Sequence, residues 1–341
     1  MMHEFSLDIV ICTYNNASLL RRTLEALANQ KVVSPWINWE VLVVNNNCTD
    51  ETSDVVERFM RSARFPLRMI REARQGLTAA RVCGVSNTNG DWIAFVDDDC
   101  LLDENWIERA ARFAVDHPTC GAFGGRIILE WETSPPAFLL SRRYAYVGKQ
   151  FGETEHRRPW LAGAGMVLRR TALEASGWVE KQLLEDRIGK RLVSGGDVEI
   201  GLRIARSYEI WYTPQCELRH VIPARRLSRE YLRGMVFGLG ASRHNAKALS
   251  WSGSYASWLL YSLVYAVGFA LFGLIESVRE GIYSGETVDM RLGLGPARGW
   301  CAAMLAMMRM DPRERGLMLG AVAATEKSRN QPLASLSMSG N

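Results

Sequence analysis

Residues 92–100 have the sequence Trp-Ile-Ala-Phe-Val-Asp-Asp-Asp-Cys. The five apolar residues are too short a run for an ordinary helix, and their aromatic and β-branched types predict a buried parallel strand. This strand runs directly into three adjacent carboxylates, Asp97, Asp98 and Asp99. In an open α/β sheet, ligands bind in the crevice beyond the carboxyl ends of the strands, so the three acids are candidate site residues.

The three aspartates need a positive partner, because adjacent anions repel one another. The hard oxygen ligands of Asp97 and Asp99, two residues apart across a tight turn, suit Mg²⁺ or Mn²⁺ that bridges to substrate phosphates. The alternative is a solvated acidic turn that caps a helix beginning near Asn105, since Asp is common in turns and at helix N-termini.

The chain before this strand repeats one pattern, which is a short apolar run, a polar tip and an amphipathic helix. The apolar runs are Leu7 to Cys12, Trp39 to Val44 and Leu67 to Ile70. With the strand that ends at Asp97, they make four βα units in about a hundred residues, which predicts a doubly wound, mostly parallel α/β sheet with helices on both faces. The polar residues at the strand ends should therefore meet at one edge of the sheet.

Composition and missing motifs narrow the classes of function. A net charge of +4 is too small to indicate nucleic-acid binding. The seven scattered cysteines contain no CxxC pair, which indicates reduced thiols in the cytoplasm, and the acidic N-terminal residues are unlike a signal peptide. Neither GxGxxG nor a P-loop motif occurs, so a metal and arginines are expected to bind any phosphates.

Four motifs stand in the order and spacing of one known family. They are IVICTYNN (9–16), WEVLVVNNNCTDET (39–52), RQGLTAAR (74–81) and WIAFVDDDC (92–100). In these the chain resembles the family 2 glycosyltransferases, whose fold is called GT-A. WLAGAGMVLRR (160–170) and GGDVEI (195–200) are similar to the family's acceptor-side glycine segment and acidic "ED" motif, with Gly196 in place of the first acid. The resemblance covers roughly residues 5–245.

The resemblance implies roles for individual residues. It places Thr13 and Tyr14 at the base and ribose, Asn46 at the base, Arg81 near the nucleotide, Asp98 beside the ribose, and Asp97 and Asp99 in the metal motif. Two further positions depart from the family, which usually has Asp where Asn45 stands and commonly Asn where Val82 stands. These departures bear on which nucleotide is bound.

Transfer of a sugar also requires a base that removes the proton of the acceptor hydroxyl. Asp197 is the candidate, because it opens a predicted helix from Asp197 to Ser207, although an acid there could simply cap that helix. A single base without a paired nucleophilic carboxylate favours inversion, as the resemblance also implies.

His220 is a candidate metal or phosphate contact. Arg225 and Arg226 are candidate phosphate clamps, with a solvated loop as the alternative.

The composition changes near residue 246. Residues 249–275 contain no charged side chain and are long enough to span a bilayer, but a helix lying in the membrane surface or buried in the protein would have the same composition. We therefore divide the chain into a catalytic domain (1–245) with nucleotide-binding (1–100) and acceptor (101–245) halves, a helical and membrane-associated region (246–325), and a disordered tail (326–341).

These observations predict a metal-dependent inverting glycosyltransferase of polysaccharide biosynthesis. It would move a sugar from a nucleoside-diphosphate sugar to a hydroxyl of a glycan or lipid-linked acceptor, in the cytoplasm or at the cytosolic face of the membrane. One alternative is a sugar nucleotidyltransferase, which would need a glycine-rich basic loop where Thr13 to Asn16 stand. The other is a degenerate glycan-binding protein, which Asp97, Asp99 and Asp197 argue against.

Overall fold

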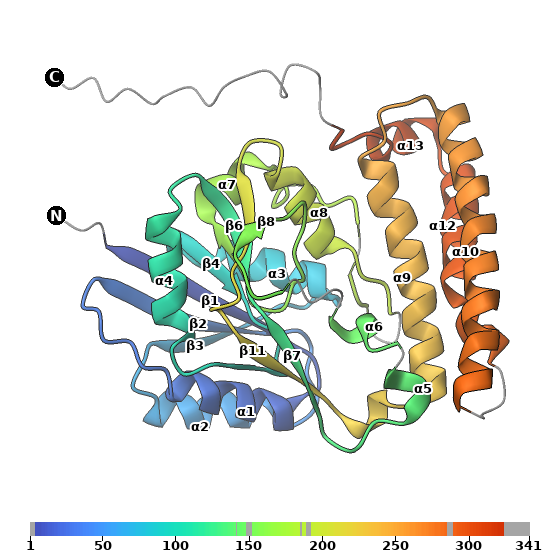
Figure 1. Cartoon of the computed structure of the whole chain (residues 1–341). Helices are drawn as coiled ribbons and strands as arrows, with labels where there is room; N and C mark the ends of the chain where they lie inside the picture. The colour runs from blue at the N-terminus through green and yellow to red at the C-terminus, as the bar shows by residue number, and fades with distance from the viewer. Residues whose placement is uncertain are drawn as a thin grey trace, which may run out of the picture.

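The computed structural model describes residues 4–140, 142–147, 152–184, 186–188, 192–284 and 289–323 (Figure 1). The tail predicted to be disordered, 326–341, lies outside the described residues.

The first hundred residues alternate strand and helix as predicted. The elements are β1 (Phe5–Thr13), α1 (Ala17–Ala28), β2 (Ile37–Asn45), α2 (Thr52–Ser62), β3 (Leu67–Arg71), α3 (Leu77–Ser86) and β4 (Trp92–Phe95). The four strands are parallel and lie in the order β3-β2-β1-β4. The carboxyl ends of β1, β2 and β4 therefore meet at one edge, which carries the three aspartates.

The second half of the sheet departs from parallel order at one strand. The sheet continues through β9 (Met166–Arg169), β6 (Cys120–Gly124), β10 (Glu209–Tyr212) and β8 (His156–Arg157). Strand β9 lies between β4 and β6 and is antiparallel to both. A second sheet consists of β5 (Cys100–Leu102), β11 (Leu218–Ile222) and β7 (Ile127–Trp131). The acids are thus followed by a short strand, and helix α4 (Trp106–Asp116) comes after it.

Helices cover both faces of the main sheet, which confirms the predicted doubly wound architecture. Alternate side chains of β1 enter two separate cores, with Ile9 and Ile11 on one face and Val10 on the other, as the period of a strand requires. Helices α1, α2 and α4 pack on the first face. Helices α3, α7 (Arg170–Ala175) and α8 (Gly196–Ile204) pack on the second.

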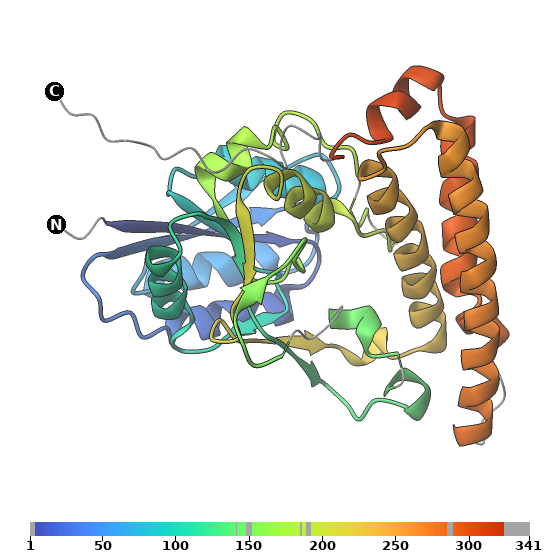
Figure 2. The ribbon, with the colours of Figure 1, turned by 45° about the horizontal axis from the view of Figure 1, so that its top comes forward.

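The C-terminal helices form a separate layer beside the sheets (Figure 2). The long helices are α9 (Arg229–Leu249), α10 (Tyr255–Ser284) and α12 (Gly295–Arg309), and α11 (Met290–Gly293) and α13 (Pro312–Met318) are short. The predicted boundary between residues 245 and 246 falls inside α9. The uncharged stretch 249–275 is divided too, because α9 ends at Leu249 and α10 begins at Tyr255.

Helices α9 and α12 pack with their backbones in close contact. A Cβ atom on Gly240 of α9 would overlap the carbonyl oxygen of Pro296, and one on Gly299 of α12 would overlap the carbonyl oxygen of Phe237. Glycine at these positions allows one backbone to approach another. The two helices therefore have little freedom to shift relative to each other.

Candidate active site

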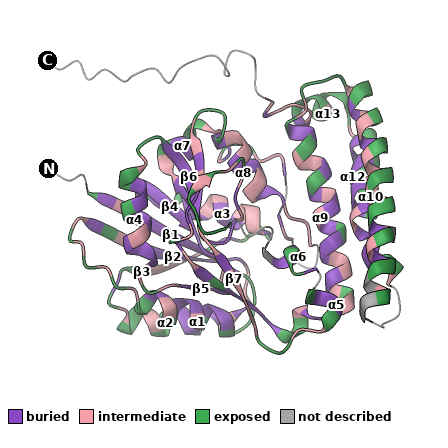
Figure 3. Ribbon diagram, viewed as in Figure 1, coloured by how far each residue is buried: buried purple, intermediate pink, exposed green. Residues whose placement is uncertain are grey.

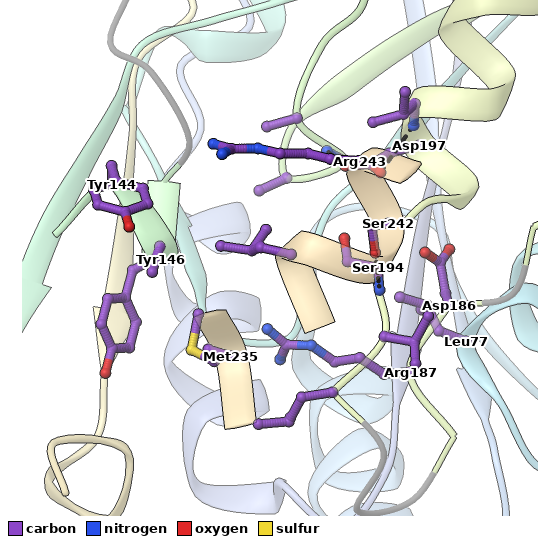
Figure 4. Close-up of a pocket in the computed structure, with 18 of the residues that line it drawn as sticks. Leu77, Tyr144, Tyr146, Asp186, Arg187, Ser194, Asp197, Met235, Ser242 and Arg243 are labelled. Carbon is purple, nitrogen blue, oxygen red and sulfur yellow. Dashed lines mark hydrogen bonds between the residues drawn. The ribbon is translucent and has the colours of Figure 1, made fainter. Parts of the chain in front are cut away.

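A cavity of about 2010 Å³ opens at the carboxyl ends of β1, β2 and β4. Every residue given a site role from the sequence lines it: Thr13, Tyr14, Asn46, Arg81, Asp97, Asp98, Asp99, Asp197, His220, Arg225 and Arg226. The cavity extends beyond them to α9 and α10, and Figure 4 shows part of its lining. The sheet edge thus brings together residues that are widely separated in sequence.

Asp98 joins the ends of β4 and β1. Thr13 Oγ1 donates to Asp98 Oδ2 at 2.7 Å, and Asn16 Nδ2 donates to Asp98 Oδ1 at 2.8 Å. Burial, assisted by the neighbouring charge of Asp99, raises the pKa of Asp98 to about 7, although these two hydrogen bonds oppose the shift. Two residues of the first motif thereby fix the acidic turn. The predicted contact of Asp98 with a ribose stays a prediction.

Asp99 is buried and already carries two basic partners. Arg226 Nη1 lies 2.8 Å from Asp99 Oδ2, and His220 Nε2 lies 3.4 Å from Asp99 Oδ1. Burial alone would raise the pKa of Asp99, but His220 and Arg226 outweigh it and hold that pKa well below its usual range. His220 therefore meets the carboxylate of Asp99, and its role as a metal ligand stays a prediction.

The ligand atoms at the end of β4 fit a hard divalent cation. Asp97, Asp99 and Cys100 each offer an atom within 4.8 Å of the others, and the carboxylates are the ligands that Mg²⁺ and Mn²⁺ prefer. The Asp97 side chain is 36% exposed, and its ion-pair partner among the described residues, Arg81, is 3.8 Å away. Asp97 is therefore the more accessible carboxylate, whereas a cation at Asp99 would compete with Arg226.

Arg81 links the nucleotide side of the cavity to the candidate base. It is buried, with Nη1 at 3.0 Å from Asp186 Oδ2 and Nη2 at 3.8 Å from Asp97 Oδ1. Asp197 Oδ2 accepts from the backbone N–H of Gly163 at 2.9 Å. Burial and the charge of Asp186 raise the pKa of Asp197 to about 6, with Arg81 opposing. Such a value is suited to a proton acceptor near neutral pH.

Asp197 lies near the N-terminus of α8 but is not its N-cap residue. The N-cap position of α8 is Gly195, and Asp197 lies inside the first turn. Its Oδ1 atom accepts from the adjacent N–H of Val198 at 2.9 Å, while its Oδ2 atom reaches out of the helix to Gly163. Asp197 thus supports the helix start and the glycine segment together.

Asp186 was missed by the sequence analysis, and it accounts for the departure at Gly196. Its Oδ1 atom accepts from the N–H groups of Gly195 and Gly196 at 3.0 and 2.8 Å. A Cβ atom at position 196 would overlap the Asp186 carboxylate, so a side chain there would displace it. The family has the first acid of its "ED" motif at the position of Gly196. In this chain, the carboxylate of Asp186 lies against that glycine instead.

The asparagines of the second motif shape the wall of the cavity. Asn46 donates to the carbonyl groups of Glu72 and Arg74 at 3.0 and 2.7 Å and accepts from the N–H of Gly76 at 2.8 Å. Asn45 accepts from the N–H of Cys48 at 2.9 Å. The hydrogen-bonding groups of Asn46 are thus engaged with its own chain, which gives it a role in positioning that wall. Its contact with a base stays a prediction.

The two arginines after β11 contact the acidic turn directly or through one side chain. They form the short 3₁₀ helix η1 (Ala224–Arg226). Arg225 Nη2 donates at 2.9 Å to Asn16, which itself holds Asp98, and Arg226 pairs with Asp99. Tyr146 donates to the carbonyl oxygen of Arg226 at 2.7 Å. Both arginines thus have partners at or beside the acidic turn, while Arg225 is also exposed to solvent. The phosphate-clamp role and its alternative, a solvated loop, stay predictions.

Comparison with known proteins identifies relatives of the chain. Residues 8–176 match the family described as "Glycosyl transferase family 2". Glycosyltransferase AglE of Haloferax volcanii is 27% identical over 192 residues, 56% of this chain and 58% of AglE. Succinoglycan biosynthesis protein ExoM of Rhizobium meliloti is 24% identical over 254 residues, 74% of this chain and 78% of ExoM. The chain thus spans less than two thirds of the length of AglE.

Solved structures show the same fold. A mannosyltransferase from Pyrobaculum calidifontis, in complex with GDP-Man and Mn²⁺, superposes with a TM-score of 0.53 at 20% identity, over 95% of this chain and 81% of that one. GalNAc-T7 with UDP, GalNAc and Mn²⁺ gives a TM-score of 0.50 at 14% identity, over 73% of this chain and 51% of that one. The fold of the chain is GT-A, as the sequence motifs implied.

Proposed function

The chain belongs to glycosyl transferase family 2, and from this premise we propose that it transfers a sugar, with inversion, from a nucleoside-diphosphate sugar to a hydroxyl of a glycan or lipid-linked acceptor. The observation that carries the proposal is that one cavity contains both the Asp97 and Asp99 pair and Asp197, an acid whose pKa is raised to about 6. A phosphate-binding edge and a proton acceptor are the two requirements of this chemistry.

At the donor side, Asp97 and Asp99 would hold Mg²⁺ or Mn²⁺. Bound there, the ion would neutralise the charge that develops on the departing nucleoside diphosphate. Arg225 and Arg226, held beside the acidic turn, are suited to the oxygen atoms of the same diphosphate. Tyr14, 46% exposed at the end of β1, offers a ring for a base or ribose. The GDP-Man and Mn²⁺ named for one fold neighbour agree with this kind of donor.

At the acceptor side, Asp197 would take the proton of the attacking hydroxyl. Among the charged groups, Asp186 has the largest effect on the pKa of Asp197. Asp186 itself forms an ion pair with Arg81 and accepts hydrogen bonds from two backbone N–H groups. The Asp186 carboxyl group is therefore engaged in structural contacts and is not free to act as a nucleophile. Asp197 thus acts as a lone base, which supports a single displacement and inversion of configuration at the anomeric carbon.

A nucleoside diphosphate panel tests the proposal. With Mn²⁺ present, at least one common nucleoside diphosphate should stabilise the protein, since a ligand at a hundred times its dissociation constant adds about 2.7 kcal/mol to the free energy of unfolding. Thermal unfolding with and without Mn²⁺ measures the effect. If none of the nucleoside diphosphates stabilises the protein in Mn²⁺, the donor assignment is wrong.

We further propose that the enzyme works at the cytosolic face of a membrane, with α10 lying along the lipid surface. Within residues Tyr255–Arg279 of this helix, an 18-residue window has a mean hydropathy of 2.0. Among the described helices, this one is long and apolar enough to cross a bilayer. Figure 3 shows that much of α10 is exposed. The large apolar residues along it that are each more than half exposed are Leu260, Leu263, Val264, Val267, Leu271, Phe272, Ile275, Val278 and Ile282. A contiguous apolar surface of this kind marks an interaction site.

The packing of α10 favours lying on the membrane over crossing it. Helix α12 runs beside α10, where Trp300 Nε1 donates to the carbonyl oxygen of Ser262 at 3.0 Å. A crossing α10 would carry α12 into the bilayer together with its exposed Arg298 and Arg309. Charged side chains at that depth are costly. A helix in the interface would bury only its apolar face.

The double substitution Leu263→Gln and Leu271→Gln should release the protein from membranes. Burial of one leucine contributes about 1.5–3 kcal/mol, so the loss of two should weaken partitioning at least about 100-fold. Co-sedimentation with phosphatidylglycerol and phosphatidylethanolamine vesicles measures it. The matched control is Val33→Gln with Val115→Gln, two exposed apolar positions outside the helical layer. A wild-type protein that stays in solution with vesicles present would refute the membrane proposal.

A further inference from the structure

One face of α9 lines the cavity along most of the length of that helix. The lining residues recur at intervals of three and four, which places them on a single helix face: Met235, Leu239, Ser242, Arg243, Ala246 and Lys247. The adjoining side of the helix contacts α12 through Gly240. The packing therefore fixes which side chains α9 presents to the cavity.

Two cations on this face have no ion-pair partner within the described ranges. Arg243 and Lys247 are one helical turn apart and exposed, and no described carboxylate lies within ion-pair distance of either. Two acids elsewhere in the cavity already have cations of their own, with Arg81 beside Asp186 and Arg226 beside Asp99. The wall formed by α9 thus presents uncompensated positive charge.

The position of this charge relates it to the candidate base. In Figure 4 the side chain of Arg243 extends from α9 into the cavity that Asp197 also lines. The guanidinium carbon of Arg243 lies 5.8 Å from the ring centroid of Phe269 on α10. Beyond Phe269, the cavity reaches Phe272, which is 64% exposed and belongs to the apolar surface of α10. Arg243 therefore lies on the part of the cavity wall that leads towards that surface, and Lys247 lies one turn further along α9.

We propose that Arg243 and Lys247 bind a phosphoryl group carried by the acceptor, a proposal that rests on the proposed glycosyl transfer. A guanidinium presents paired donors to phosphate oxygens, and an ammonium one turn away adds a second charge. The acceptor's phosphoryl group then lies against α9 while its hydroxyl reaches Asp197. Such a phosphoryl group can belong to a lipid-linked glycan, with its chain passing Phe272, or to a soluble sugar phosphate.

Two simple probes test this site while the donor site is filled. Wild-type protein saturated with Mn²⁺ and the nucleoside diphosphate that stabilises it is titrated with methyl phosphate and with hexyl phosphate by calorimetry. The double variant Arg243→Gln and Lys247→Gln should bind both probes at least about tenfold more weakly, because each loses hydrogen bonds to charged groups. Stabilisation by the nucleoside diphosphate and Mn²⁺ should be unchanged. Arg298→Gln, an exposed cation of α12 outside the cavity lining, is the matched control.

The comparison of probes distinguishes the two sources of the phosphoryl group. For a lipid-linked acceptor, hexyl phosphate should bind more tightly than methyl phosphate, by about fourfold for each methylene that is buried, and Phe272→Ser should remove that difference. For a soluble sugar phosphate, the two probes should bind equally. Either result supports the phosphoryl site. Equal binding by the double variant and the wild type, or no binding by the wild type, overturns it. Nucleoside diphosphate binding reports separately on the donor assignment.

Discussion

Asp197→Asn should slow sugar transfer by about two to four orders of magnitude, the usual contribution of a positioned proton acceptor. The amide keeps the shape of the side chain and can still accept from the N–H of Gly163, so the local structure should persist. Binding of the nucleoside diphosphate should be nearly unchanged. Turnover at saturating donor and acceptor, with calorimetry of the nucleoside diphosphate, separates the two effects.

The pH profile gives an independent check on the same residue. Burial first, and then Asp186, raises the pKa of Asp197 to about 6, and only the ionised carboxylate can accept a proton. In the wild type, kcat/KM should therefore fall as the pH is lowered through about 6, and this limb should vanish in the Asn variant. Asp54→Asn, an exposed acid in the first turn of α2, is the control. Wild-type turnover by Asp197→Asn would leave that residue with a structural role only.

Asp97→Asn should lower the transfer rate by at least about 100-fold, because a divalent ion that acts as a Lewis acid supplies several kcal/mol of transition-state stabilisation. It should also remove the Mn²⁺-dependent part of the thermal stabilisation by a nucleoside diphosphate. Transfer rates over a range of Mn²⁺ concentrations, together with thermal unfolding, measure both. Asp116→Asn, an exposed acid of α4, is the control. Full Mn²⁺ dependence in the Asp97 variant would contradict the metal assignment.

Asp97 is the better test of the metal site than Asp99. Loss of the Asp99 charge would leave the partly buried Arg226 without its carboxylate, and breaking a buried ion pair costs up to about 3–5 kcal/mol. The Asp99 variant would therefore combine a folding defect with a metal defect. Asp97 is partly exposed, and its contact with Arg81 is long at 3.8 Å.

The donor half of the site could be predicted because its information is local. Each strand there is an apolar run that ends in polar residues, and the carboxyl ends of neighbouring parallel strands must meet. The approach of Asp98 to Thr13 and Asn16 follows from that rule. A rule of this kind places residues at an edge but does not say which of their atoms are already engaged. The commitment of Asn46 to its own chain was therefore not predictable.

The acceptor half depends on contacts that no local pattern encodes. Asp186 lies in a segment without a helical or strand period and pairs with Arg81, which is 105 residues away in the sequence. Strand β9 has an ordinary strand composition, and its antiparallel placement between β4 and β6 depends on the path of the chain before it. Helix α9 begins at Arg229, before the predicted boundary near residue 246, and its polar composition gives no local signal of where the helical layer starts.

The close backbone contact between α9 and α12 has a consequence for which acceptors can react. Helix α12 is packed in turn on α10, so the exposed apolar surface of α10 and the cations of α9 belong to one layer. On the proposed geometry, the height of Arg243 above the membrane is then constant. The N–H of Ser194 donates to Ser242 Oγ at 3.1 Å, which ties α9 to the segment that precedes Asp197. An acceptor would be selected by length, since only a hydroxyl at the matching number of sugar units from its phosphoryl group would reach the base. Sugar chains that are one unit too short or too long would bind without reacting.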